Sequence, residues 1–136
     1  MPNISAVSIG DSLPQRSFKP SNVSLFMYNA AIWNPHRIHY DERYAMEVEG
    51  YPGVVIDGPL QGDWLAQTVA EWLGEEGELL EFAFTNRQAA YLGEELYCGG
   101  DVSAKNLAAK TVTLTLFVNN ADGITITPGS AVVRQV

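Results

Sequence analysis

The sequence predicts an α+β domain in which one antiparallel sheet wraps around one long central helix. The helix is predicted at residues 58–73, where apolar side chains recur at helical spacing on one face. The sheet is predicted from later segments with alternating or β-branched residues, at 78–92, 96–105, 110–119 and 124–136. A helix face and a sheet face each need an apolar partner, so the four strands and the helix are expected to pack as layers.

The length and composition indicate one acidic domain that spans residues 1–136 and is long enough to bury a core. A net charge of −8 argues against nucleic-acid binding and against a polybasic membrane anchor. No apolar run approaches the length of a membrane-spanning helix. Cys98 is the single cysteine, so an internal disulfide is impossible and a reducing, cytoplasmic location is expected. One cysteine and two histidines are too few for the usual zinc site, and we expect no metal and no cofactor.

Shorter elements are predicted before the long helix. Residues 1–20 suggest an extended arm with one short edge strand. Residues 21–33 are apolar nearly throughout, which fits either a strand or a buried helix. Asn34-Pro35 ends this segment, because the residue before proline is disfavoured in the helical region. Asp41 is a good N-cap for a short helix, and residues 54–56 form a buried approach to the long one.

The start of the long helix has several informative residues. Asp57 or Gly58 can cap it, and Pro59 fits the first turn. Gln61 is expected to lie away from the apolar face. Gly62 lowers helix propensity, which favours a position where a strand or a ligand approaches closely.

Both histidines of the chain lie in the segment Asn34-Pro35-His36-Arg37-Ile38-His39-Tyr40-Asp41. Histidine exchanges protons near neutral pH, so this segment is a candidate catalytic loop. The same residues are also compatible with a solvated loop in which His39 bonds a neighbouring carbonyl. Both interpretations remain open from the residues alone.

The segments YNAAIWNPHRIHYDERYA and EGYPGVVIDGPLQ resemble the MaoC-like (R)-specific enoyl-CoA hydratase and dehydratase family, which has the hotdog fold. They are most similar to the branch of mesaconyl-CoA and itaconyl-CoA hydratases and type 2 3-hydroxyacyl-thioester dehydratases. That branch has the pattern N-x-H-R-I-H-Y-D, followed by G-Y-P-G-[LV]-V-V-H-G-P-L-Q. The resemblance implies a single hotdog domain that forms a homodimer or pairs with a second hotdog chain.

The resemblance also implies an activity, which is reversible hydration of a 2-enoyl thioester or dehydration of a 3-hydroxyacyl thioester. The acyl group would be carried by coenzyme A or an acyl carrier. His39 matches the catalytic histidine and would move the proton, while Asn34 stands where the broader family has aspartate and would place the water. The N–H of Gly58 would stabilise the thioester oxyanion at the helix N-terminus, although an ordinary flexible helix start is the alternative. His36 or Asp41 is a candidate for a second acid–base group.

Two residues depart from the family pattern. An amide cannot act as a general base, so Asn34 can orient water without activating it. Asp57 stands where the branch has histidine before Gly-Pro-Leu. Capping of the long helix is its ordinary role; the alternatives are that Asp57 supplies the missing carboxylate or changes which acyl group fits.

Substrate-binding candidates surround these positions. Aromatic residues are candidates for an acyl pocket and basic residues for the phosphates of coenzyme A, although plain core packing and solvated charge are the common roles of such residues. The substrate-binding candidates are Tyr28, Trp33, Tyr40, Asp41, Pro59 and Arg37, with Arg43, Arg87 and Lys105 as further phosphate ligands. A rival interpretation is a thioesterase in which Asp57 directs water at the carbonyl. Another is a non-catalytic subunit whose partner chain brings the reacting residues.

Overall fold

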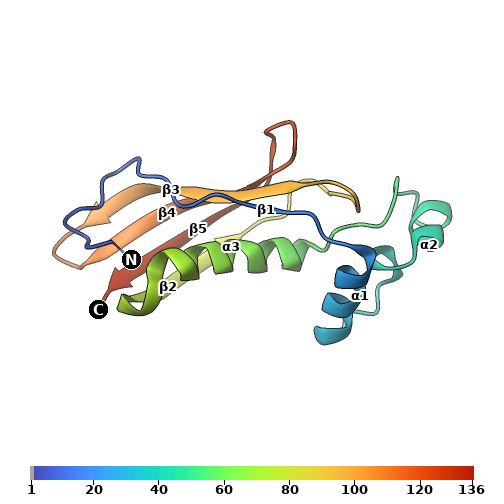
Figure 1. Ribbon diagram of the computed structural model, residues 1–136, viewed down its shortest axis with the longest axis horizontal. Helices are drawn as coiled ribbons and strands as arrows, with labels where there is room; N and C mark the ends of the chain where they lie inside the picture. The colour runs from blue at the N-terminus through green and yellow to red at the C-terminus, as the bar shows by residue number, and fades with distance from the viewer. Residues whose placement is uncertain (1) are drawn as a thin grey trace.

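The computed structural model describes residues 2–136 and has the predicted hotdog architecture. Helix α3 lies along one face of a five-stranded antiparallel sheet (Figure 1). The elements in chain order are β1 (Arg16–Phe18), α1 (Asn22–Ala31), the 3-10 turn η1 (Arg37–His39), α2 (Glu42–Glu47), α3 (Gly58–Leu73), η2 (Gly74–Glu76), β2 (Gly77–Phe84), β3 (Leu96–Asn106), β4 (Thr111–Asn119) and β5 (Thr125–Gln135).

Helix α3 has the bounds that the sequence predicts, and its apolar face packs on the sheet. Gly62 makes the expected close approach, because a Cβ atom there would lie 2.3 Å from Cζ of Phe84 on β2. The expectation for Gln61 is wrong: this side chain is buried at 2% exposure. Its carbonyl oxygen accepts a hydrogen bond from the Thr127 hydroxyl at 2.6 Å, which provides the polar partner that burial requires.

The strand order is β1-β3-β4-β5-β2. The β3–β4–β5 meander is as predicted, but the prediction that β2 continues the meander is wrong, because β2 pairs with β5. The expected strand 78–92 ends at Phe84. Thr85 and Arg87 still donate hydrogen bonds to β5 carbonyls. Further on, the chain bonds to the approach segment of α3, where Leu92 donates to Val54 and Ile56 donates to Ala90, both at 2.8 Å. These hydrogen bonds between residues 90–92 and 54–56 replace the predicted pairing of this part of the chain with β3.

The apolar segment 21–33 forms helix α1, which begins at Ser21 with a capping box. It is not the buried helix that its composition suggests, because within α1 only Leu25 and Asn29 are buried. Phe26 is 57% exposed and Met27 is 64% exposed. The short helix α2 begins as predicted, with the Asp41 carboxylate accepting a hydrogen bond from a first-turn N–H at 3.0 Å.

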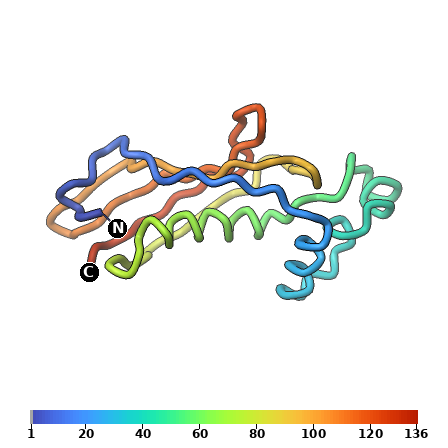
Figure 2. The backbone as a smooth tube through the Cα atoms, in the orientation of Figure 1, coloured from blue at the N-terminus to red at the C-terminus, as the bar shows by residue number. Residues whose placement is uncertain are grey.

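Helices α1 and α2 lie beyond the N-terminal end of α3, at the end of the molecule opposite both termini (Figures 1 and 2). Within residues 2–136, no helix combines the length and apolar character needed to cross a lipid bilayer. Cys98 is buried in β3, and burial raises the pKa of its thiol to about 12. The thiol is therefore protonated and unreactive at neutral pH.

Candidate active site

The segment with both histidines is hydrogen-bonded to the approach segment of α3. The Val55 N–H donates to the Ile38 carbonyl at 2.9 Å, and Nδ1 of His39 lies 2.8 Å from the Val55 carbonyl oxygen. A carbonyl oxygen only accepts, so Nδ1 carries the hydrogen and Nε2 is the basic nitrogen of the neutral ring. Only 10% of the His39 side chain is exposed. His39 is thus held beside the first residues of α3 with one nitrogen free to exchange a proton.

Asp57 is completely buried next to His39. Its Oδ1 accepts a hydrogen bond from Nδ2 of Asn29 at 3.0 Å and lies 3.6 Å from Nδ1 of His39. Its Oδ2 has no hydrogen-bond partner among the described residues. Burial raises the pKa of the Asp57 carboxyl, an effect that the charge of His39 and the Asn29 amide oppose.

The predicted capping role of the Asp57 side chain is wrong. Asp57 occupies the N-cap position of α3, but its carboxylate makes no hydrogen bond to the helix backbone. The physical reason is its direction, because the side chain points inward to Asn29 and His39. The Asp57 carboxylate therefore accepts no hydrogen bond from the backbone N–H groups in the first turn of α3.

The first residue of α3, Gly58, offers one of the N–H groups that lack an intrahelical partner. Pro59 follows it and has no N–H. The side chain of Asn86 lies against Gly58, since a Cβ atom there would be 2.4 Å from Asn86 Oδ1. Asn86 Nδ2 donates to the Gly58 carbonyl at 3.3 Å and to Thr127 Oγ1 at 3.0 Å. Thr127 in turn bonds Gln61, so a polar chain from β5 fixes the start of the helix.

Asn29, Asn86, Gln61 and Thr127 have no sequence signal that reveals these contacts. Their partners are far along the chain, with separations of 28 residues for the Asn29–Asp57 and Asn86–Gly58 bonds and 66 for the Thr127–Gln61 bond. Only the tertiary fold brings them together. The motif pattern ends at Gln61, and even there it does not distinguish a buried glutamine from an exposed one.

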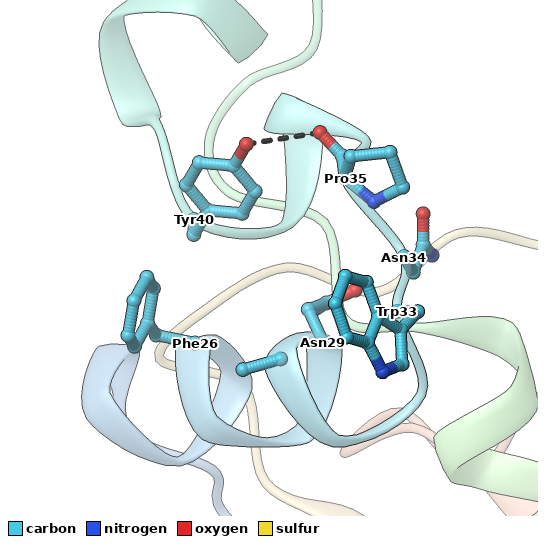
Figure 3. A pocket seen from close by; sticks show the side chains of 7 residues that line it. Phe26, Asn29, Trp33, Asn34, Pro35 and Tyr40 are labelled. Atoms are coloured by element: carbon cyan, nitrogen blue, oxygen red, sulfur yellow. Dashed lines mark hydrogen bonds between the residues drawn. The ribbon is translucent and has the colours of Figure 1, made fainter.

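An open, mainly apolar pocket of about 410 Å³ lies between α1 and η1 (Figure 3). The Tyr40 ring faces Phe26 edge-on across it, with ring centroids 6.1 Å apart, and the Tyr40 hydroxyl donates to the Pro35 carbonyl at 2.9 Å. Trp33 lies on the same pocket and is 91% exposed. Asn34 also lines it, and its Oδ1 accepts a hydrogen bond from the His36 N–H at 3.1 Å.

The His36 ring lies edge-on to His39 with centroids 5.8 Å apart, and its Nε2 is 3.8 Å from a Glu49 carboxylate oxygen. Tyr28 is at a different hollow of the surface, where its hydroxyl donates to Asp63 at 2.7 Å. Half of the His36 side chain is exposed.

The basic candidates are dispersed. Arg37 pairs with the Asp41 carboxylate at 2.8 Å, and this hydrogen bond raises the pKa of the guanidinium. Arg43 pairs with a neighbouring glutamate on α2. Lys105 donates to backbone carbonyls of the N-terminal arm. Arg87, by contrast, lines a hollow of about 230 Å³ that also includes Gly58, Gln61 and Asn86.

Within the described chain, no three or more His, Cys, Asp or Glu side chains are grouped as metal ligands. The arrangement provides instead one fixed imidazole, a buried carboxylate and a helix N-terminus. A proton carrier beside a helix N-terminus is suited to a reaction in which negative charge develops on a carbonyl oxygen.

The family model for hydroxyacyl-thioester dehydratase type 2 matches residues 5–92. The chain belongs to this family. A mesaconyl-C(4)-CoA hydratase of Chloroflexus aurantiacus is 51% identical to this dehydratase-family chain over 45 residues, which are 33% of the chain and 16% of that protein. A mitochondrial hydroxyacyl-thioester dehydratase type 2 of Schizosaccharomyces pombe is 43% identical over 51 residues, 36% of the chain and 17% of that protein. The chain thus matches about a sixth of the length of these relatives.

Solved structures agree on the fold of the dehydratase-family chain. An (R)-hydratase from A. caviae involved in PHA biosynthesis superimposes with a TM-score of 0.87 at 17% identity, covering 96% of this chain and 98% of that one. A MaoC-like dehydratase superimposes with a TM-score of 0.90 at 24% identity, covering 99% of this chain and 42% of that one. At these identities the likeness establishes the hotdog fold.

Proposed function

We propose that this chain catalyses the reversible addition of water to a 2-enoyl thioester, and the reverse dehydration of a 3-hydroxyacyl thioester. The observation that carries the proposal is His39 held through Nδ1 on the Val55 carbonyl, directly before the N-terminus of α3. Membership of the hydroxyacyl-thioester dehydratase type 2 family supports the same reaction.

In the proposed hydration, Nε2 of His39 takes a proton from water as the water oxygen bonds to C3 of the enoyl group. The electron pair of the C2–C3 double bond moves toward the thioester carbonyl, whose oxygen becomes negative. The Gly58 N–H and the dipole of α3 stabilise this oxygen. The imidazolium then returns its proton to C2, which gives the 3-hydroxyacyl thioester and regenerates neutral His39. Dehydration follows the same steps backwards.

Asn34 has the supporting role of orienting the water, since its side chain lines the pocket next to the histidine segment. His36 is more exposed and faces Glu49, so we assign it a secondary part in proton exchange with solvent.

The acyl chain is proposed to occupy the pocket of about 410 Å³ between α1 and η1. Trp33, Phe26 and Tyr40 provide apolar contacts there, and Pro59 leaves the Gly58 N–H as the first donor of α3. Arg87 is the best-placed phosphate ligand, because it shares a hollow with Gly58 whereas Arg37 is engaged by Asp41. The thioester carrier is coenzyme A or an acyl carrier.

The assay is to supply the purified chain with crotonyl-CoA, mesaconyl-CoA and a 3-hydroxyacyl-CoA. Hydration removes the ultraviolet absorbance of the conjugated enoyl thioester. His39→Ala is expected to abolish this hydration activity while the circular dichroism spectrum of the chain stays unchanged. Wild-type rates in His39→Ala would refute the assignment. Asn34→Asp is expected to retain or increase activity, whereas complete inactivation would show that the amide is required as a donor.

The thioesterase alternative places Asp57 at the thioester carbonyl with a water. Asp57 is fully buried and bonded to Asn29, which favours hydration over this role. Release of free thiol in the same assay would reverse that preference. Absence of both activities would favour a non-catalytic subunit.

A second hotdog chain is the proposed partner, either another copy or a different protein. Strand β2 is at one edge of the sheet and carries exposed Leu79 and Leu80. Unpaired apolar edge strands are prone to pair with another chain. Two solved neighbours of the same fold are the ChsH1-ChsH2 and HadBC complexes from Mycobacterium tuberculosis. We also infer a cytoplasmic location from the free Cys98 thiol.

Gel filtration tests the partner proposal. Leu80→Lys is expected to shift the wild-type dimer to the elution volume of a monomer. The matched control is Leu107→Lys, which changes a leucine that is 58% exposed, against 40% for Leu80, in the turn between β3 and β4. An unchanged elution volume for Leu80→Lys, or an identical shift in the control, would contradict the edge-strand interface.

A further inference from the structure

We propose that Asp57 and Asn29 form a buried charge-stabilising pair for His39, in which the Asp57 carboxylate stabilises the imidazolium that forms during proton transfer. This inference rests on the proposed function for its kinetic consequence. Asp57 touches no reacting atom in this proposal and acts through His39, so it is a positioning residue.

The position of Asp57 is the first argument. The carboxylate is 0% exposed, and its Oδ1 lies 3.6 Å from the nitrogen of His39 that faces away from the reaction. The Asn29 amide holds that oxygen at 3.0 Å and is itself anchored by donating to the Leu25 carbonyl at 2.8 Å. The carboxylate is therefore fixed on α1 as well as at the start of α3.

The charge balance around Asp57 is the second argument. A buried carboxylate is costly unless it is paired with a cation or fully hydrogen-bonded, and Asp57 Oδ2 has no partner among residues 2–136. Within residues 2–136, the one ion-pair partner of Asp57 is His39, which is cationic only when protonated. The His36 ring lies edge-on to His39 with centroids 5.8 Å apart, and a Glu49 carboxylate oxygen lies 3.8 Å from Nε2 of His36. The site is thus incomplete while His39 is neutral and gains a salt bridge when His39 accepts a proton.

The Val55 carbonyl, and not Asp57, selects the tautomer of His39, so the proposed role of Asp57 is limited to stabilising the charge of the imidazolium. This carbonyl accepts the Nδ1 hydrogen of His39 at 2.8 Å, so the tautomer with basic Nε2 persists without Asp57. Loss of the Asp57 charge should therefore slow the reaction less than loss of the correct tautomer does. We expect a fall in kcat of roughly 10–100-fold, compared with about 10⁴-fold where an amide replaces an aspartate that sets the tautomer.

The two departures from the family pattern become complementary in this proposal. Asn34 lacks the carboxylate that the histidine segment has in the broader family, and Asp57 adds one at a position where the related branch has histidine.

The test compares the wild-type chain with Asp57→Asn, which preserves size and the oxygen that Asn29 binds. The matched control is Asp11→Asn: Asp11 is exposed, it lies outside the candidate site, and its carboxylate accepts a hydrogen bond from the backbone N–H of Ser8. Hydration of crotonyl-CoA is measured from pH 5 to 9, choosing steps of about half a pH unit so that a histidine transition is resolved. For Asp57→Asn we expect the lower kcat, little change in KM, and an acid limb of the pH–rate profile displaced to lower pH.

A second measurement does not depend on activity. The chain has two histidines, so His36→Gln identifies the His39 ring resonances by NMR. These resonances are expected to titrate at lower pH in Asp57→Asn than in the wild type and at the wild-type pH in Asp11→Asn. An unchanged titration in Asp57→Asn would overturn the inference, as would an unchanged kcat and pH profile in an active enzyme. If the wild type hydrates no thioester but the NMR shift occurs, the proposed function fails while the charge pair stands.

Discussion

Asp57→Asn is expected to stabilise the folded chain at neutral pH, even though it slows the proposed reaction. The wild-type carboxyl is buried, its Oδ2 has no hydrogen-bond partner in the described part of the chain, and burial raises its pKa. An amide has no charge to bury. The amide nitrogen that the variant carries at position 57 can donate to Oδ1 of Asn29, which is also buried and has no hydrogen-bond partner among residues 2–136.

The size of the effect follows from the unpaired oxygen. A buried polar atom without a partner costs about 1–3 kcal/mol, so the free energy of unfolding should rise by that amount. For a chain of this length each kcal/mol raises Tm by roughly 4 °C. Each pKa unit by which folding raises the Asp57 pKa corresponds to about 1.4 kcal/mol of folding free energy. The measured increase in the free energy of unfolding therefore also indicates how far the Asp57 pKa is raised.

The dependence on pH has a definite sign. A carboxyl whose pKa is raised by folding stabilises the fold below its ordinary value of about 3.9, and this stability is lost as the pH rises toward the raised value. The advantage of Asp57→Asn should therefore be small in acid and grow to a plateau toward neutrality. Urea unfolding at several pH values measures it, with Asp11→Asn as the control. A less stable Asp57→Asn at pH 7, or a pH-independent difference, would refute the reasoning.

Three further substitutions test the packing and capping contacts. Gly62→Ala should lower the free energy of unfolding by about 1–3 kcal/mol in urea titrations, because its methyl group would overlap the Phe84 ring; wild-type stability would show that the ring moves freely. Gly58→Ala should displace the Asn86 side chain and reduce kcat, and the double variant with Asn86→Ala should recover part of the loss; no recovery would exclude this clash as the cause. In urea unfolding at several pH values, the free energy of unfolding of Asp41→Asn should fall less steeply toward acid pH than that of the wild type. The Asp41 pKa is lowered by its cap bond and by a paired arginine, so its stabilisation is present above the ordinary pKa and lost as pH falls through the lowered one.

The sequence predicts the elements that depend on local patterns. The bounds of α3 follow from a proline in the first turn and a continuous apolar face, and the Asp41 cap follows from residue type. The pairing of β2 with β5 does not follow, because alternation along β2 is the same whichever strand lies beside it. Pairing depends on the residues after β2: Thr85 and Arg87 still bond to β5, and residues 90–92 then bond to the approach segment of α3 instead of turning back along β2.

The site divides in the same way. His39 and Gly58 are proposed as site residues from the motif, because the motif fixes their spacing along the chain. The inward direction of Asp57 is not, since an aspartate before Gly-Pro is an ordinary helix cap in sequence terms. Its actual partner, Asn29, lies on another helix, and no rule of local structure connects the two.

The position of β2 also constrains how the chain folds. β2 is complete at residue 84, but its only neighbour in the sheet of the described chain is β5, which begins at residue 125. During synthesis, α3 and β2 emerge from the ribosome well before the strand that covers β2, so Leu79 and Leu80 stay unpaired in the nascent chain. Closing this long loop makes β2–β5 pairing a late and slow event. A ribosome stalled between the two strands would therefore hold a chain in which both edges of β2 are unpaired.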